Sequence, residues 1–451
     1  MQHKLSYYTL FSDEMEETSE VVAFSSRSAQ MMVIHSDTYK LLLENRLNEL
    51  PPHLQESLLR HHILVPKEEN ELETILTENN RFNEESTVFY YIIQPSANCQ
   101  LGCSYCGQAH SKDTLQEDTE EKIIARIKDK LDASSKFETL SIAWFGGEPL
   151  LGLKSIRSLT PKLKKLAAEH RLAYMSKMAT NGVSLKPEVY FELVNTLGLT
   201  HFEITLDGDQ EFHDVRRNTK KGNQTFDVIV QNLLEIVHAK EYDPTKAAIT
   251  IRCNVDKHNY LGIKPLLHTL KSNGLLEKIS AFYLAPVHAW GNDAHLTSLP
   301  IEEFADFEIS ILLEQLRLGM PLDMVGTRKK QVCMIVDKEA ELVDAFGNIF
   351  NCSEISYVPG LENSEYKLGN IKNDPTASFS EKPLSNWNDL IAEHTFPCHA
   401  CKILPVCGGS CPKSWVDGIP PCPSEKFNMK DRLSLAYLMG QPDFTDMLHH
   451  E

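Results

Sequence analysis

The chain has 451 residues, of which 42% are hydrophobic, and its formal net charge is -18 at pH 7. This length predicts more than one domain, and the apolar share is ample for packed cores. The acidic balance argues against nucleic-acid binding, which needs a basic surface to meet phosphates. No apolar run approaches the length of a membrane span. We therefore expect neither a nucleic acid nor a membrane among the partners.

Residues 1–84 have the pattern of a small domain, without low complexity or a targeting signal. Apolar runs bounded by turn residues predict its strands, and helical periodicity with caps and prolines predicts its helices. The expected elements are a hairpin of Val21–Phe24 and Met31–Ile34, a helix capped by Ser36, a helix Leu54–Leu59, a strand Ile63–Val65 and a polar linker Lys67–Asn83.

Three cysteines follow the apolar run Val88–Ile93, which predicts a buried strand. Cys99, Cys103 and Cys106 have the spacing Cys-x-x-x-Cys-x-x-Cys, with Tyr105 before the last of them. Three thiolates on one tight loop can hold three corners of a 4Fe-4S cube and leave the fourth iron open to a substrate or cofactor. A structural zinc site is the simpler alternative for such a triplet.

Strand and helix patterns alternate for some two hundred residues from this loop onward, which predicts a parallel sheet curled into part of a barrel. Helical stretches separate the runs, for example Phe226–Ile236 and Leu261–Leu270. The six expected strands are Val88–Ile93, Leu140–Phe145, Tyr174–Thr180, Phe202–Leu206, Ala248–Val255 and Ile279–Ala285.

Polar and glycine-rich motifs follow these strands at their carboxyl ends, where barrels of this kind carry their active sites. With the cysteine loop, they resemble the radical S-adenosylmethionine (SAM) enzymes. The resemblance implies that Gly146-Gly147-Glu148-Pro149 holds the SAM amino group and that polar residues on the fifth strand cradle its methionine or ribose part. The implied SAM-binding residues are Gly146, Gly147, Glu148, Pro149, Asn181, Thr205, Asp207, Arg216 and Arg252. Thr180-Asn181-Gly182 and His213-Asp214 match family patterns in the same order.

Seven further cysteines lie in the last third of the chain, and their frame resembles the SPASM domain, which binds auxiliary iron-sulfur clusters. The resemblance implies one 4Fe-4S cluster on Cys398, Cys401, Cys407 and Cys422, and a second on Cys333, Cys352 and Cys411. Relatives with full ligation have a further cysteine where this chain has Thr327, so water, Asp323 or a bound substrate is left as the fourth ligand of the second cluster. A zinc ribbon remains the alternative for this segment.

The resemblance predicts an α/β fold with a partial (β/α)6 TIM barrel. We expect three domains: a winged-helix-like, leader-peptide-recognition domain at residues 1–84, the radical SAM barrel at 85–300, and a bridging helix with the SPASM domain at 301–451. The first assignment rests on the hairpin and helices alone. Such domains bind extended peptides by offering the edge of a strand.

The whole pattern resembles the SPASM radical SAM maturases of ribosomally made peptides (RiPPs). This implies SAM and three 4Fe-4S clusters as cofactors, with Cys99, Cys103 and Cys106 at the catalytic cluster. One electron passed to SAM would yield a 5'-deoxyadenosyl radical, which abstracts hydrogen from a precursor peptide. The expected product is an oxidative crosslink: a thioether, carbon-carbon or ether bond. The implied partners are a precursor peptide with its leader and a reductant such as flavodoxin or ferredoxin.

Three alternatives stay open. An anaerobic sulfatase-type maturase would oxidise a serine or cysteine to formylglycine, but Ser353 and Glu354 stand where that subgroup has an aspartate after the second SPASM cysteine. A peptide epimerase would need a hydrogen donor, for which Cys253 is a weak candidate. A non-catalytic peptide-binding protein would have no need of both the cysteine triplet and the glycine-rich turn. The clustered cysteines favour metal binding over disulfides, and we expect a reduced, cytoplasmic protein.

Overall fold

The computed structural model describes residues 2–379 and 381–441. The chain forms two compact units, and each is built from separate stretches of sequence. Unit 1 contains residues 1–85, 300–336 and 386–451, and unit 2 contains residues 86–299 and 337–385. No helix in the described ranges combines the length and the hydropathy needed to cross a membrane.

Unit 2 is built on a nine-stranded sheet in the order β11-β10-β9-β8-β7-β6-β12-β13-β14. The six strands from β6 to β11 are parallel to their neighbours, and β12 adds to the β6 edge, also in parallel. The antiparallel strands β13 and β14 complete the sheet. The strands are β6 (Val88–Ile93), β7 (Thr139–Trp144), β8 (Ala173–Thr180), β9 (His201–Thr205), β10 (Ala248–Val255), β11 (Ala281–Pro286), β12 (Glu341–Val343), β13 (Asn348–Phe350) and β14 (Lys367–Asn370). The six predicted barrel strands are confirmed, with ends shifted by at most two residues.

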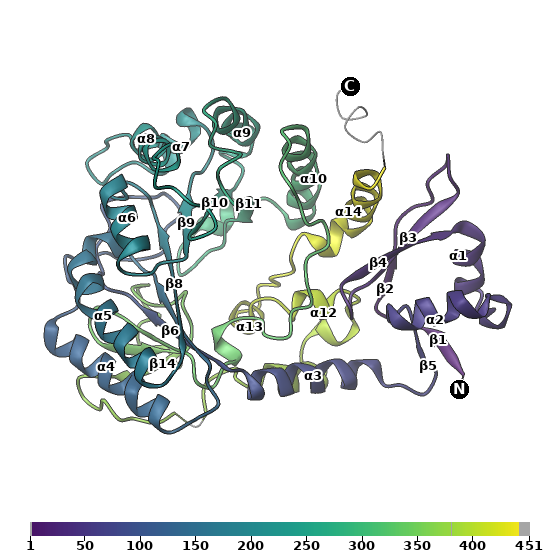
Figure 1. The fold of residues 1–451 in the computed structure, drawn as a ribbon, viewed down its shortest axis with the longest axis horizontal. Coiled ribbons are helices and arrows are strands. Elements are labelled where there is room, and N and C mark those ends of the chain that lie inside the picture. The colour runs from purple at the N-terminus through teal and green to yellow at the C-terminus, as the bar shows by residue number, and fades with distance from the viewer. Residues whose placement is uncertain (1, 380, 442–451) are drawn as a thin grey trace. The chain divides into compact units, whose positions relative to one another are not determined.

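Helices follow the first strands of this sheet and cover its outer face (Figure 1). They are α4 (Glu117–Asp132), α5 (Leu153–Glu169), α6 (Pro187–Asn195), α7 (Gln210–Arg216), α8 (Phe226–Val237) and α9 (Ile263–Ser272). Each longer helix buries one apolar stripe, as α8 does with Ile229, Leu233 and Ile236. Strand β9 buries every second residue, Phe202 and Ile204, whereas β10 buries most of its residues. The mixed α/β fold with a partial barrel is therefore confirmed.

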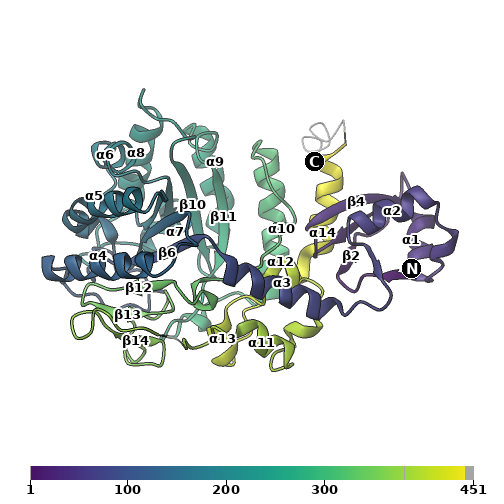
Figure 2. The same cartoon turned by 60° about the horizontal axis from the view of Figure 1, so that its bottom comes forward.

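Residues 337–385 belong to the same unit as the barrel because their strands extend the barrel sheet. A buried ion pair fixes this extension: Arg126 of α4 donates to both oxygens of Glu341 of β12, each at 2.7 Å. Both side chains are almost fully buried. Figure 2 shows β12, β13 and β14 below the barrel strands. This part of the cysteine-rich region is thus built onto the barrel itself.

Unit 1 begins with a three-stranded antiparallel sheet in the order β2-β3-β4. One face, with Val21 and Ala23, packs on the first two helices, while the other face, with Val22 and Phe24, packs on a second core. The elements are β1 (His3–Leu5), β2 (Thr9–Phe11), β3 (Glu20–Ser25), β4 (Gln30–His35), α1 (Ser36–Leu43), α2 (Pro52–Arg60) and β5 (Leu64–Pro66). The predicted hairpin, helices and short strand are confirmed.

Two details of the N-terminal prediction are wrong. The cap of α1 is His35, whose ring accepts from the backbone N–H of Asp37, and Ser36 is already the first helical residue. The polar linker Lys67–Asn83 is mostly helix α3, Glu71–Glu85. On this helix Ile75, Leu76 and Asn79 are buried. The helix is therefore held by one narrow buried stripe, and its mainly polar composition resembles that of a linker.

The rest of unit 1 comes from the C-terminal third of the chain. Helices α10 (Ile301–Arg317) and α14 (Glu425–Met439) pack together, and α14 also contacts β3. A buried arginine joins the two helices, because Arg432 donates to Glu308 at 2.5 Å and to Asn428 at 2.8 Å. The short helices are α11 (Trp387–Ala392), α12 (Leu404–Cys407) and α13 (Pro412–Val416). Of the C-terminal cysteines, Cys407 is the last residue of α12, and Cys411 is the N-cap residue of α13.

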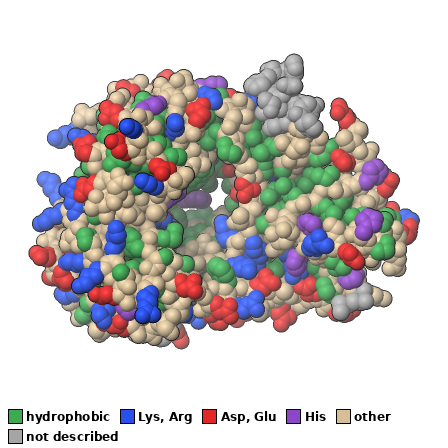
Figure 3. All heavy atoms as spheres, in the orientation of Figure 1, with side chains coloured by type: hydrophobic (Ala, Val, Ile, Leu, Met, Phe, Trp, Pro, Cys, Tyr) green, Lys and Arg blue, Asp and Glu red, His purple; other side chains and the backbone are tan. Residues whose placement is uncertain are grey.

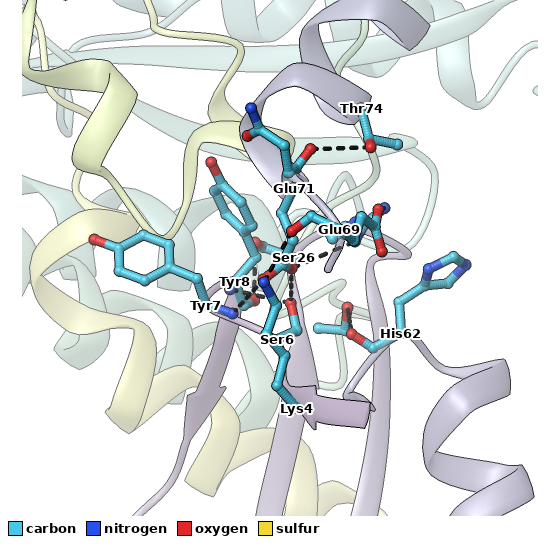
Figure 4. Close-up of polar contacts among 12 residues, drawn as sticks. Lys4, Ser6, Tyr7, Tyr8, Ser26, His62, Glu69, Glu71 and Thr74 are labelled. Atoms are coloured by element: carbon cyan, nitrogen blue, oxygen red, sulfur yellow. Dashed lines mark hydrogen bonds and ion pairs between the residues drawn. The ribbon is translucent and has the colours of Figure 1, made fainter. Parts of the chain in front are cut away.

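A buried carboxylate ties the N-terminal segment to the start of α3 (Figure 4). Glu71 accepts from the hydroxyl of Ser6 at 2.5 Å, from the backbone N–H of Tyr7 at 3.0 Å and from Arg27 at 3.3 Å. The hydroxyl of Tyr7 donates to the carbonyl of Ala400 at 2.7 Å. The N-terminal sheet and the C-terminal cysteine segment therefore form one structural unit.

Candidate functional site

The three cysteines of the first motif lie on the loop that follows β6. The backbone N–H of Cys106 donates to the carbonyl of Cys103 at 3.1 Å, which closes a tight turn between these two ligand positions. Cys99 is buried, whereas Cys106 is exposed. Burial raises the pKa of Cys99, and burial with the neighbouring thiols Cys106 and Cys99 raises the pKa of Cys103 to about 12. A bound cation would therefore be needed to make the thiols of Cys99 and Cys103 thiolates at neutral pH.

The glycine-rich turn after β7 packs against this loop. Gly146 and Gly147 have φ values of +79° and +48°, and a Cβ at Gly147 would lie 2.6 Å from the carbonyl oxygen of Asn98. The backbone N–H of Glu148 donates to the same carbonyl at 2.7 Å. Only glycine permits this approach and this backbone conformation together. The turn therefore holds the cysteine loop in place.

The carboxylate of Glu148 is committed to the protein. It accepts from the backbone N–H of Leu150 at 3.0 Å, from the hydroxyl of Thr180 at 2.7 Å and from the backbone N–H of Asn181 at 2.8 Å. The side chain is 1% exposed, and its burial raises its pKa. Glu148 thus joins the loops after β7 and β8. Asn181, which it positions, has its amide nitrogen 3.7 Å from the sulfur of Cys99.

The hydroxyl of Tyr105 is the centre of a polar network behind the cysteine loop. It donates to Asp207 at 2.6 Å and accepts from the amide of Asn254 at 2.9 Å and from Arg217. Asp207 follows β9 and also accepts from the backbone N–H of Asn254 on β10 at 2.8 Å. The guanidinium of Arg216 lies over the Tyr105 ring at 5.0 Å. One tyrosine therefore links the loop to the ends of two strands.

Arg217 is a site residue that the sequence interpretation missed. Its side chain is 6% exposed, its positive charge acts on Cys103 to lower that thiol's pKa, and its Nε has no hydrogen-bond partner among the described residues. Arg216, the predicted residue, is paired with Asp256 at 2.6 Å, and its Nε likewise has no partner among the described residues. A buried, unpartnered guanidinium nitrogen is costly unless a ligand accepts from it. The two adjacent arginines at the end of α7 were the available signal.

His213 and Asp214 support this arrangement without facing the loop. The Nδ1 of His213 accepts from the backbone N–H of Asp207 at 3.2 Å, so Nε2 is assigned the proton and donates to Thr225 at 3.1 Å. Burial lowers the pKa of His213 to about 3, with Arg217 adding to the effect. Asp214 accepts from the backbone N–H groups of Thr225 and Phe226, at the start of α8. These residues hold α7 and Asp207 in position.

Arg252 lies on β10, next to Thr205 of β9 in the sheet register. Its Nε donates to the side chain of Asn254 at 2.9 Å, and it pairs with Glu203 at 3.7 Å. Arg252 also lowers the pKa of Glu354, which burial raises more strongly. A continuous polar network therefore runs from Tyr105 through Asn254 to Arg252, with Glu354 near its end.

The segment after β13 brings Cys352 to the barrel unit. Gln94, at the end of β6, donates to the hydroxyl of Ser356 at 2.7 Å, and the backbone N–H of Ala109 donates to the carbonyl of Tyr357 at 2.7 Å. Gln108 bridges the segment to the glycine-rich turn, since its amide donates to the Ser356 carbonyl at 3.3 Å and accepts from Gly147 at 3.2 Å. The second SPASM cysteine is thus carried by a segment that contacts the cysteine loop.

Four C-terminal cysteines line one cavity in unit 1. They are Cys398, Cys401, Cys407 and Cys422, and the cavity wall is completed mainly by apolar groups, including Ile403, Leu404 and Trp415. Burial raises the pKa of Cys398 to about 12, and the other three thiols add to this effect. In the described ranges, no three His, Cys, Asp or Glu side chains converge closely enough for a single metal ion.

The remaining three C-terminal cysteines are divided between the units. Cys333 and Cys411 belong to unit 1, and Cys352 belongs to unit 2. Their predicted common cluster stays a prediction, as does its fourth ligand.

The fold and the cysteine loop define a class. Residues 93–255, from the end of β6 to the end of β10, match the Radical SAM superfamily. The chain therefore contains a radical SAM enzyme domain, with a site for S-adenosylmethionine and an iron-sulfur cluster, and its cysteine-rich C-terminus fits a SPASM domain.

Similarity to particular proteins extends beyond that domain. The serine-type anaerobic sulfatase-maturating enzyme of Bacteroides thetaiotaomicron is 23% identical over 360 residues, which are 72% of this chain and 83% of the relative. The cysteine-type anaerobic sulfatase-maturating enzyme of Clostridium novyi is 23% identical over 359 residues, 73% of this chain and 89% of the relative.

Solved structures of anSMEcpe with bound AdoMet share the fold. One has a TM-score of 0.55 and 18% identity, covering 81% of this chain and all of that chain. A second, which also contains the Cp18Cys peptide, has a TM-score of 0.52 and 19% identity, covering 80% of this chain and 99% of that chain.

Proposed function

We propose that the protein is a radical SAM peptide maturase, which installs an oxidative thioether, carbon-carbon or ether crosslink in a precursor peptide. The observation that carries this proposal is the presence of two thiol sites: a three-cysteine loop beside Arg217, a buried arginine whose Nε has no partner among the described residues, and a cavity lined by four cysteines. A three-thiol site leaves an iron free for SAM, and a four-thiol site suits an electron carrier.

In this proposal, Cys99, Cys103 and Cys106 hold the catalytic 4Fe-4S cluster. The turn Gly146-Gly147-Glu148-Pro149, with Asn181, Thr205, Asp207, Arg216 and Arg252, forms or supports the SAM site. Bound together, the cluster and SAM supply a 5'-deoxyadenosyl radical that abstracts hydrogen from the substrate. Arg217 offers its free Nε to an anionic group at this site, and Tyr105 keeps the loop aligned with β9 and β10.

The C-terminal cysteines complete the electron path. Cys398, Cys401, Cys407 and Cys422 would hold one auxiliary cluster, and Cys333, Cys352 and Cys411 a second. Forming a crosslink by hydrogen abstraction releases one further electron and one proton from the peptide, and an auxiliary cluster can accept that electron. Flavodoxin or ferredoxin would deliver the first electron.

The N-terminal domain, residues 1–84, would bind the leader of the precursor peptide. Strand β4 is an edge of its sheet, and Met31 and Val33 on it are 39% and 48% exposed. Figure 3 shows hydrophobic side chains gathered at the surface around the β2–β4 sheet and α14. An exposed strand edge with apolar side chains can pair with an extended peptide.

A second candidate function is the oxidation of a serine or cysteine to formylglycine. Two sulfatase-maturating relatives favour it. Glu354, two residues after Cys352, is a carboxylate near the position of the aspartate base in that subgroup, and it is buried beside Arg252. The presence of an N-terminal domain with an open strand edge favours the crosslinking function over this one.

The first experiment is anaerobic reconstitution followed by iron and sulfide analysis and assay of 5'-deoxyadenosine release. Three clusters predict about twelve irons per chain, and the Cys99/Cys103/Cys106→Ala variant should lose about four irons and all release. Zinc without release would overturn the proposal in favour of a non-catalytic binding protein. With a serine- or cysteine-containing sulfatase-type peptide, a product trapped by a hydrazine would show an aldehyde and support formylglycine formation instead.

A further inference from the structure

Lys426 lies at the four-cysteine cavity. Its Nζ donates to the sulfur of Cys422 at 3.3 Å, and it is one of the residues that line the cavity. Apart from the four cysteines, it is the single charged side chain in that lining, among the residues that the structure describes. The rest of the wall is apolar or backbone apart from Ser410, and outside the lining the charge of Lys329 also acts on Cys407.

The position of Lys426 on α14 is unfavourable without an anionic partner. It occupies the first turn of the helix, where the aligned peptide dipoles place positive charge and disfavour a cation. Lys430, one turn later on the same helix, is exposed and pairs with Asp13 at 2.9 Å. Lys426 instead donates to a cysteine sulfur. The sulfur of Cys422, as a negatively charged thiolate ligand of a cluster, would be the anionic partner of Lys426.

We propose that Lys426 sets the reduction potential of the auxiliary cluster held by Cys398, Cys401, Cys407 and Cys422, through an N–H···S hydrogen bond to Cys422 and its positive charge. A cluster ligated by four thiolates is anionic and gains one more negative charge on reduction. A nearby cation stabilises the reduced form more than the oxidised form, so it raises the potential. Lys426 is a positioning residue, since it acts through the cluster and not on the substrate.

A raised reduction potential would favour electron transfer from the peptide to the auxiliary cluster. An auxiliary cluster that accepts the electron released by the peptide needs a potential high enough to be reduced by that step. Lys426 shifts the cluster toward accepting. The inference rests on the proposed assignment of the four cysteines to a cluster. It adds Lys426 as the residue that sets the reduction potential of that cluster.

The test is a redox titration of the full chain, reconstituted anaerobically in the Cys99/Cys103/Cys106→Ala background so that auxiliary clusters alone give the electron paramagnetic resonance signal. Lys426→Met should shift the midpoint to a more negative value. Because solvent partly screens the charge of an exposed lysine, we expect the ratio of reduced to oxidised cluster at a fixed potential to fall by only about threefold to tenfold. Lys426→Arg should restore most of the midpoint, and Lys430→Met should leave it unchanged.

The outcomes separate this inference from the assignment beneath it. If Cys398→Ala loses no iron, the four-cysteine cluster itself is absent and both fail. If Cys398→Ala loses iron but Lys426→Met titrates like Lys430→Met, the cluster stands and the role of Lys426 is overturned. A shift in Lys426→Arg as large as in Lys426→Met would also overturn it. A shift that shrinks at high ionic strength supports it, because salt screens an exposed charge.

Discussion

The hydroxyl of Tyr105 donates a 2.6 Å hydrogen bond to the carboxylate of Asp207, which is completely buried. The two residues are far apart in sequence, one between cluster cysteines and the other after β9. Their bond connects the position of the cysteine loop to the carboxyl end of the sheet. It also makes the loop geometry sensitive to a single oxygen atom.

Replacing Tyr105 by Phe keeps the ring and removes that oxygen. Asp207 and Arg217 each lose a buried partner, so we expect a loss of about 1–3 kcal/mol in the free energy of unfolding and a slower release of 5'-deoxyadenosine at full iron content. Denaturant unfolding and the release assay measure these two effects. Tyr242→Phe is the matched control, since its hydroxyl donates a hydrogen bond of the same 2.6 Å length, to the backbone carbonyl of Lys278 at an exposed site. Equal effects of the two variants would contradict the role given to Tyr105.

Replacing Arg217 by Gln removes the buried charge beside Cys103 and Asp207. Removing one member of a buried charged pair lowers the free energy of unfolding by about 3–5 kcal/mol. The variant also lacks the Nε donor that we propose for an anionic group bound with SAM. We expect lower stability and at least a tenfold weaker binding of SAM, measured by equilibrium dialysis on the reconstituted protein. Arg157→Gln breaks an exposed pair with Glu192 and should change neither quantity. Unchanged SAM affinity in Arg217→Gln would contradict an anion-binding role.

Protonation of His213 should make the free energy of unfolding depend on pH. Its pKa is about 3 in the folded protein and 6.5 in the unfolded chain. The unfolded state therefore binds more protons between these values, so the stability that neutral His213 provides is complete above pH 6.5 and is lost as the pH falls toward 3. His213→Gln should unfold with a weaker dependence on pH in this window. Identical profiles for the wild type and the variant would show that other groups govern the acid limb.

Replacing Gly409 tests whether close packing beside the four-cysteine cavity is needed for cluster binding. Its φ is +87°, and an added Cβ would lie 2.7 Å from the indole nitrogen of Trp387, which donates to the carbonyl of Gly408 at 3.0 Å. Gly409→Ala should displace the Cys407–Cys411 loop and lower the iron content by about four atoms per chain. Gly418→Ala has a comparable φ of +77° with nothing within 4 Å, so it isolates backbone strain from the steric clash. Iron loss in both variants would point to strain alone.

Replacing Glu341 by Gln tests the attachment of β12 to the barrel. Burial alone would raise the pKa of Glu341, but hydrogen bonds from Arg126 and the charges of Lys130 and Arg126 lower it overall. The carboxylate is therefore charged at neutral pH, and its stabilising contribution is lost as the pH falls through the lowered pKa. We expect the variant to lose about 3–5 kcal/mol near pH 7 and progressively less toward acid. A constant difference across pH would contradict this.

Much of the molecule is determined by its sequence. Cysteine spacing is a local property, because ligands of one loop must be close along the chain, and so the triplet at 99–106 and the Cys398–Cys407 run could be recognised without a structure. Helices cover the outer face of the six barrel strands (Figure 1), so each strand carries buried apolar residues between clear turn signals. The polar stretch at residues 67–83 gave no such signal, because only a narrow stripe of α3 is buried.

The tertiary structure alone decided which polar groups meet. Tyr105, Asp207, Asn254 and Arg217 come from a loop, two strand ends and a helix end, and no spacing rule links them. The same holds for Arg216 and Arg217: neighbours in sequence, they take different partners, because the end of α7 directs one guanidinium to Asp256 and the other to Tyr105 and Asp207. It also decided that Cys352 is carried by the barrel sheet and Cys333 and Cys411 by the other unit. Packing between residues that are distant along the chain determines such contacts, so local sequence patterns do not reveal them.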